Sequence, residues 1–289
     1  LRCLVGSEMC IRDRGLKGDS GVSDLTYSSG TLTIDTTVGY WIHSGGDHGD
    51  GLIQSHDDNG ITYKTCTFTF NSISLTGSLN LVLKGDNSLV LKTQSNGNVV
   101  IGIDINLDGD DWTYDNSDAR KGTVNPILNN YRSWIGLGKI GGKNGIKSGN
   151  FVGIGPGAGN YRVEGTTEND GYKWKGGGGG YGSAGQYAST GFGQPYGSPT
   201  LAHLHGGSSG GGGQWTGSGA GGGALSLEAH GDGNLTILSG VTISANGGIT
   251  SERDNDRQGG GGSGGSLRFA GNNITNNGTI SATGGPDIK

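Results

Sequence analysis

Cysteine is scarce in this chain, which limits both disulfide and metal chemistry. Of 289 residues three are cysteines, and two of these lie within residues 1–14, so neither a disulfide framework nor a thiolate metal site is expected. The third, Cys66, shares a strand face with Phe68 and Phe70. We expect it to be a buried apolar residue rather than a reactive thiol.

Apolar residues and runs of like charge are also scarce. Apolar residues make up 30% of the chain, which is too little for a broad conventional core. Because the net charge is only −5 and no basic run occurs, nucleic acid is not an expected partner. No stretch reaches the roughly 18 apolar residues of a membrane-spanning helix, so no membrane span is expected, and no signal peptide is visible.

The first residues do not match the rest of the chain. Residues 1–14, LRCLVGSEMCIRDR, contain no initiating Met and resemble the translated read-through of a sequencing-library adapter at the end of an environmental open reading frame. Three triplets follow in residues 15–23, each beginning with glycine, as a collagen triple helix requires. A truncated collagen-like stalk would make the protein a homotrimer, and a chance run in a glycine-rich chain is the alternative.

Short apolar strands recur along the chain between stretches rich in glycine, which accounts for 65 residues. Residues 88–107 align without a gap onto residues 224–243, an alignment that places Leu107 on Ile243. A shorter third copy occupies residues 264–285. Such self-similarity indicates a repeat architecture, because one unit of this kind cannot bury its own apolar face.

The sequence predicts an all-β fold, specifically a parallel β-helix (β-solenoid) with a long glycine-rich insertion. Residues 24–111 would form the first part of the solenoid, residues 112–223 the insertion and residues 224–289 the second part. Strands of three to five residues with brief corners suit the faces of such a helix, in which one coil takes roughly 20–25 residues. The residues expected to point inward are Leu79, Leu81, Leu83, Leu89, Leu91, Val99, Ile101, Ile105 and Leu107.

The insertion interleaves glycine tracts with aromatic residues, which a flexible linker does not need. Two interpretations stay open, namely ordered packing of glycine helices of the polyproline II type and a flexible segment. Because flat aromatic rings stack on sugars and anchor interfaces, the insertion is also the expected contact surface, unless these rings merely cover the solenoid. The candidate ligand-binding residues are Trp134, Trp174, Tyr181, Tyr196 and Trp215.

One acidic segment has the spacing of a calcium-binding loop, D-x-[DN]-x-[DN]-G. Its candidate ligands are Asp104, Asn106, Asp108, Asp110 and Asp115. The alternative is a solvated strand edge, on which these polar residues point outward while Ile103, Ile105 and Leu107 point inward. The strand edge is favoured because the aligned copy lacks the acids. Calcium is the only cofactor that the sequence suggests.

Two histidine-containing segments are weaker candidates. Residues 43–58 hold three histidines and four aspartates, but their spacing fits no standard set of metal ligands. His203 and His205 lie two residues apart in an extended segment and would share one face, and a solvated turn is the favoured interpretation. No nucleophile, phosphate-binding or cofactor motif is recognised, so no catalytic residue is assigned and an enzyme is not favoured.

Three segments resemble known surface proteins. Residues 259–285 resemble glycine-rich repeats of bacterial and phage-associated surface proteins with β-helical bodies. Residues 77–109 resemble the passenger regions of exported filamentous or autotransporter-like adhesins, and residues 176–213 resemble phage tail-tip adhesins with polyglycine loops. The resemblance implies an extracellular protein on a cell or virion surface.

The expected function is therefore structural and adhesive, with contact to a cell-surface glycan or a surface protein through the insertion. Two alternatives remain. One is a polysaccharide-degrading enzyme on the same body, which would need a groove with converging carboxylates. The other is ice binding, which would need an outward ladder of threonines in register. The threonines concerned are Thr31, Thr33, Thr65, Thr67 and Thr69.

Overall fold

The computed structural model shows an all-β protein, as expected from the sequence. It describes residues 23–111, 137–146, 152–164, 173–176, 178–185, 191–198, 200–213, 216–250 and 259–285. Every helix or strand in these ranges is a β-strand. Within the same ranges no helix is long and apolar enough to cross a membrane.

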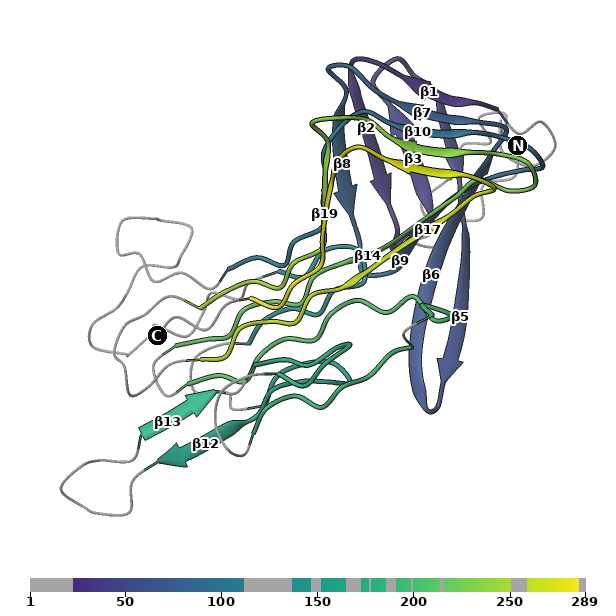
Figure 1. Ribbon diagram of the computed structural model, residues 1–289. Helices are drawn as coiled ribbons and strands as arrows, with labels where there is room; N and C mark the ends of the chain where they lie inside the picture. Colours follow the sequence, from purple (N-terminus) through teal and green to yellow (C-terminus); the bar gives the residue numbers. More distant parts are fainter. Residues whose placement is uncertain are drawn as a thin grey trace, which may run out of the picture.

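The strands are short, and their arrangement into sheets can be followed in Figure 1. In chain order they are β1 (Leu25–Tyr27), β2 (Thr31–Asp35), β3 (Tyr40–His43), β4 (His48–Asp50), β5 (Leu52–Asp58), β6 (Ile61–Phe70), β7 (Ile73–Leu75), β8 (Asn80–Lys84), β9 (Ser88–Thr93), β10 (Val99–Ile101), β11 (Ile105–Asn106), β12 (Tyr161–Glu164), β13 (Lys173–Gly176), β14 (Ala224–Glu228), β15 (Leu235–Ile237), β16 (Thr242–Ser244), β17 (Ser266–Ala270), β18 (Ile274–Asn276) and β19 (Thr279–Ser281).

Most strand pairs are parallel and join segments far apart in the sequence. One sheet has the order β1-β7-β10-β15-β18 and a second has the order β11-β16-β19, both entirely parallel. A third sheet, β17-β14-β9-β6-β5, is parallel except for β5, and in the fourth, β8-β2-β3-β4, only β2 and β8 are parallel. Strands β12 and β13 form a separate antiparallel pair.

The repeat copies pair side by side, as the alignment predicts. Leu227 of β14 lies opposite Leu91 of β9 on one side and Phe269 of β17 on the other. Strands β9 and β14 are therefore direct neighbours although the whole insertion separates them in the sequence. Their inward side chains stack in one apolar column, because parallel pairing in register keeps equivalent residues on the same face.

One detail of the alignment is wrong. Ile243 pairs with Ile105, not with Leu107. Three residues separate Ile101 from Ile105, whereas five separate the equivalent Ile237 from Ile243, and a turn with Gly240 at φ +81° takes up the difference. The extra length is two residues, so the inward face of β16 is preserved.

The inward-facing residues expected from the sequence lie in or against the core. Leu79, Leu89, Leu91, Val99, Ile101, Ile105 and Leu107 are buried, and Leu81 and Leu83 pack against the core while partly buried. Cys66 is fully buried beside Phe68 and Phe70. Burial raises the pKa of the Cys66 thiol to about 12, so this thiol stays protonated and unreactive at neutral pH.

The polar segment that precedes β6 forms structure that the sequence pattern does not indicate. Strands β3 and β4 add to β2 in antiparallel fashion, and β5 forms a long hairpin with β6. Strands β3 and β4 therefore lie beyond β2 at one edge of its sheet, and β5 lies beyond β6 at the edge of another. At the other end of the stack, β17, β18 and β19 have no outer neighbour among the described strands.

Candidate functional site

Glycine-rich segments run side by side away from the sheets (Figure 1). We call this array the glycine body. It comprises residues 107–110, 140–146, 178–180, 206–213, 216–223, 245–250, 259–265 and 282–285. Several of its segments continue directly from or into the strands β11, β14, β16, β17 and β19, so that the sheets hold one end of the array.

Hydrogen bonds within the glycine body follow a three-residue period. Successive N–H groups of residues 218–224 donate in rotation to three different neighbouring segments. The bonds run from Ser218, Gly221 and Ala224 to the carbonyl groups of Ile146, Lys143 and Ile140, from Gly219 and Gly222 to Gly260 and Ser263, and from Ala220 and Gly223 to Asp110 and Leu107. Three residues per turn is the repeat of a polyproline II helix. In the described residues, the glycine tracts therefore pack as ordered helices of this type.

The array has no room for side chains at its contacts. A Cβ atom at Gly221 would overlap the carbonyl oxygen of Gly207, and one at Gly262 would overlap that of Ala220. The absence of a side chain lets neighbouring backbones approach to hydrogen-bonding distance. This requirement accounts for the glycines at the described contacts of the glycine body.

The segments turn back at the end of the glycine body that is remote from the sheets. Asp110 N–H donates to Leu137 at 2.9 Å, Gly213 N–H donates to Thr216 at 3.0 Å, and the Thr250 hydroxyl donates to Gly259 at 3.1 Å. The residues that flank segments 112–136, 214–215 and 251–258 therefore lie at this same end, which we call the far end. Leu137, the first described residue after 112–136, is 55% exposed. Val152 is 59% exposed, and it lies near the same end, because a Cβ at the adjacent Gly153 would be 2.5 Å from the carbonyl oxygen of Gly210.

The structure describes two of the five aromatic residues expected to bind ligand. Tyr181 lies against strand β17, and Tyr196 lies against the glycine body. The Tyr181 hydroxyl is hydrogen-bonded to that of Ser266, and the Tyr196 hydroxyl donates to Gly206 at 2.5 Å. The two rings meet edge to face with centroids 4.8 Å apart. Burial raises the pKa of both phenols, so both remain protonated donors.

The other three aromatic candidates are not described as side chains. Trp134 and Trp215 lie outside the described residues. Trp174 belongs to β13, where its backbone pairs with Val163. Their expected role in binding stays a prediction.

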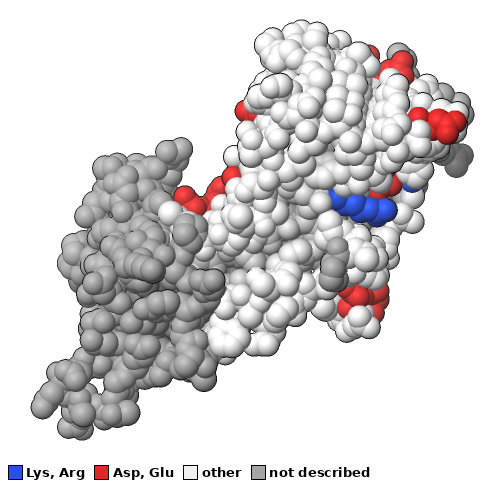
Figure 2. All heavy atoms as spheres, in the orientation of Figure 1, with Lys and Arg blue, Asp and Glu red and all other residues white. Residues whose placement is uncertain are grey.

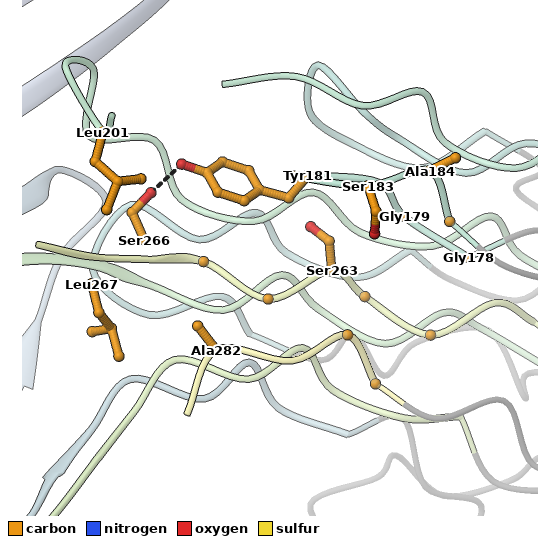
Figure 3. Close-up of a pocket in the computed structure, with 18 of the residues that line it drawn as sticks. Gly178, Gly179, Tyr181, Ser183, Ala184, Leu201, Ser263, Ser266, Leu267 and Ala282 are labelled. Atoms are coloured by element: carbon orange, nitrogen blue, oxygen red, sulfur yellow. Dashed lines mark hydrogen bonds between the residues drawn. The ribbon is translucent and has the colours of Figure 1, made fainter. Parts of the chain in front are cut away.

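A cavity of about 600 Å³ lies beside Tyr181 (Figure 3). Residues 261–265, which are four glycines and Ser263, form part of its wall, and the larger side chains around it are Tyr181, Leu201, Leu267 and Ile280. None of the described residues that line it carries a charged side chain. The cavity therefore offers main-chain hydrogen-bonding groups and apolar side chains rather than charge.

His203 and His205 lie next to Asp58, at the end of β5. His205 Nε2 is 2.9 Å from one carboxylate oxygen and His203 Nε2 is 3.7 Å from the other. The Tyr63 hydroxyl lies 3.0 Å from Nδ1 of His203. His205 is 3% exposed, so the expectation of a solvated turn is wrong for this residue, because the β5–β6 hairpin folds over it.

This Asp58 cluster fastens the insertion to the sheets. The two nearby serine hydroxyl groups, of Ser88 and Ser266, donate to the carbonyl groups of Leu204 and His205 rather than to an imidazole. A nucleophile activated by a histidine needs a hydrogen bond between the two side chains. The observed bonds instead hold segment 200–206 in place.

The histidines and aspartates of residues 43–58 divide into separate groups. His43 stacks on Tyr27 with ring centroids 3.9 Å apart, and Tyr27 donates its hydroxyl hydrogen to Asp47 at 3.0 Å. Burial raises the pKa of the Tyr27 phenol, and the Asp47 carboxylate raises it further. Among the described residues, no group of three or more His, Cys, Asp or Glu side chains could hold a metal ion.

The described members of the proposed calcium loop contact backbone or lysine. Asp104 accepts the N–H of Thr242 at 2.7 Å, and Asp108 accepts that of Asn246 at 2.6 Å. Asn106 accepts the N–H of Asp108, and Asp110 lies 3.5 Å from the Lys139 amine. Burial alternates along Ile103–Leu107 as the strand-edge interpretation requires. Asp115 lies outside the described residues.

A carboxylate that the sequence analysis missed lies on the sheet formed by β9, β14 and β17. Glu228 accepts the Ser226 hydroxyl at 2.7 Å, and its other oxygen lies 3.1 Å from His230 Nε2. Arg268 is 3.6 Å away. Burial alone would raise the pKa of Glu228, but the hydrogen bonds and the positive charge outweigh it and hold the pKa below its usual value of 4.5. Residues 226, 228 and 230 share a face by strand alternation, whereas only the strand register brings Arg268 next to Glu228.

Comparison with known proteins adds no relative to this description. No family model, no curated protein and no solved structure matches the chain. Its function is therefore inferred from the arrangement of its own residues.

Proposed function

We propose that this chain is a structural and adhesive protein of a cell or virion surface. In this proposal the parallel sheets are the faces of a β-helix, and the glycine body projects from that helix as a rigid support. The proposed ligand is a cell-surface glycan or a surface protein, which the far end of the glycine body contacts.

The position of the flanking residues Asp110, Gly213 and Thr250 at the far end carries the proposal. The three-residue hydrogen-bond period ties each glycine segment to several neighbours, so the array resists bending. Leu137 and Val152 expose apolar side chains near the far end, and neither side chain belongs to the hydrophobic core. Figure 2 shows that most of the described surface on the visible face carries no charged side chain. Contact by apolar and main-chain groups fits these features better than electrostatic attraction.

Binding of labelled protein to a panel of intact bacterial cells tests the proposal. Leu137→Asp and Val152→Asp should each weaken binding by about 1–3 kcal/mol, as expected when a charge replaces an apolar contact residue, and should leave the melting temperature unchanged. Val38→Asp is the matched control, because Val38 is 67% exposed but lies on the sheets between β2 and β3. Equal loss of binding by the control would move the contact surface to the sheets.

Treatment of the cells separates the two kinds of ligand. Periodate oxidation should abolish binding if the ligand is a glycan, and protease treatment should abolish it if the ligand is a protein. Steady release of oligosaccharides from the cells would contradict the adhesive role and favour an enzyme.

The two alternative functions find no support in the described residues. The cavity beside Tyr181 is lined by no carboxylate. The threonines proposed for ice binding do not form a ladder, because Thr33 lies opposite Val82 and Thr67 lies opposite Val90. We therefore propose neither activity.

A further inference from the structure

The segment 259–265 is surrounded by other glycine segments of the body. Its hydrogen bonds reach five of them in the described chain. The bonds are Gly219 N–H to Gly260, Gly260 N–H to Gly211, Gly262 N–H to Gly248, Gly285 N–H to Gly262 and Gly179 N–H to Gly261. Each partner belongs to a different segment, namely 216–223, 206–213, 245–250, 282–285 and 178–180 in that order.

These five segments form an incomplete ring. Segment 282–285 is bonded to segment 245–250, which is bonded to segment 216–223, which is bonded in turn to segment 206–213. Segment 178–180 follows, because a Cβ at Gly179 would lie 2.6 Å from the Ser208 carbonyl oxygen. In a hexagonal packing of equal helices, each helix has six neighbours. Segment 259–265 has five, so one position is open between segments 178–180 and 282–285.

The open position is the 600 Å³ cavity. Its lining includes Gly178 and Gly179 on one side, Gly284 and Gly285 on the other, and residues 261–266 between them (Figure 3). The cavity is thus where the array would place one more helix. It also runs beside β17 and β19, the outermost strands of their sheets.

The main-chain N–H and C=O groups of Gly264 lie at the open position without a hydrogen-bond partner in the described chain. Gly264 is nevertheless buried, and it lines the cavity. The N–H groups of Gly260 and Ser263 serve one neighbour, and those of Gly262 and Gly265 serve another. By the three-residue period, the N–H group of Gly264 should bond to a third neighbouring segment. No such segment is present among the described residues, and the open position is where it would lie.

We propose that this cavity binds an extended glycine-rich segment of a partner protein in the polyproline II conformation. Such a segment would donate and accept main-chain hydrogen bonds at every third residue, as the five present neighbours do. Glycine is required where the occupant faces the wall, because carbonyl oxygens stand at the contact positions throughout the array. The described lining carries no charge, so it favours main-chain and apolar contacts over ion pairs. This inference is independent of the adhesive role.

Amide hydrogen exchange with a synthetic peptide tests the inference. The probe is an eight-residue peptide with the sequence of residues 206–213, GGSSGGGG, and its control is the counterpart AASSAAAA. The glycine peptide should slow exchange of the Gly264 amide at least tenfold and leave Gly262, already bonded to Gly248, unchanged. No slowing by the glycine peptide, or equal slowing by the alanine peptide, would overturn the inference. Slowing by maltoheptaose instead would identify a saccharide site and overturn it too.

Substitutions that fill the cavity provide the second arm. Gly182 lines the cavity, and a Cβ there meets nothing within 4 Å, so Gly182→Trp should fold and weaken peptide binding at least tenfold. Gly284→Leu is a second variant, because its Cβ makes only an ordinary contact of 3.7 Å. Leu52→Trp, at a 60% exposed position on β5, is the control and should bind as the unmodified protein does. Unchanged binding by both cavity variants would contradict the proposed site.

Discussion

At the scale of single residues, glycine does here what apolar side chains do in a conventional core. The chain has little apolar material, yet its glycine segments bury their backbones against one another and satisfy them by hydrogen bonds. The sequence shows the glycine content but leaves open whether the tracts are ordered. Only the hydrogen-bond period decides this, because it depends on neighbours that lie far apart in the sequence, such as Gly109 and Asn246.

Gly221→Ala tests the close approach directly. Its Cβ would overlap the carbonyl oxygen of Gly207, so neighbouring segments must move apart. We expect destabilisation of about 1–3 kcal/mol, as for other overpacked interiors, measured by denaturant unfolding. Gly284→Ala is the control, since its Cβ makes an ordinary contact, and it should stay within about 0.5 kcal/mol. Equal effects of the two substitutions would argue against tight packing.

Glu228 gives a prediction for pH. Its folded-state pKa is below 4.5, so its contribution to stability is fully present above pH 4.5 and is lost as the pH falls through the lower folded value. The Glu228→Gln variant has no carboxylate at this position, so its stability does not include this pH-dependent contribution. We therefore expect its stability, measured by thermal unfolding, to fall less steeply below pH 4.5 than that of the unmodified protein. Parallel curves for the two proteins would rule out the hydrogen-bonded carboxylate.

At the scale of elements, alternation in the sequence predicts strands wherever the inner face is apolar. Strands β9 and β10 follow such patterns, and their inward residues are buried. Strands β3, β4 and β5 escape prediction because their sequences lack that alternation and are stabilised by antiparallel pairing. The contact of His205 with Asp58 escapes it too, since 147 residues separate the two and no local pattern links them.

The stacked apolar column predicts the effect of a buried charge. Leu91 and Leu227 lie opposite each other and are 1% and 0% exposed. Replacing either by Asp should cost several kcal/mol, because the carboxylate would be buried without a partner. Thr69→Asp is the matched control, at an exposed strand position opposite Lys92. Melting temperatures of Leu91→Asp or Leu227→Asp close to that of the control would contradict the inward-facing repeat.

At the scale of the whole molecule, two modes of packing are joined in one chain. Parallel strands stack by apolar side chains, and the same chain continues into helices that pack without side chains. Tyr181, which contacts Ser266 of β17, and the Asp58 cluster hold the two together. The proposed adhesive role depends on this continuity, because a flexible insertion could not keep its connections at one end.

Amide hydrogen exchange of the glycine body tests this central claim most directly. The amides of Gly219 and Gly222 are bonded to Gly260 and Ser263, so they should exchange far more slowly than amides of an unfolded glycine peptide, at rates near those of Leu89 and Leu225 in the sheets. A flexible insertion would leave these glycine amides unprotected while the sheet amides stay protected. That result would contradict an ordered glycine body and the function proposed for it.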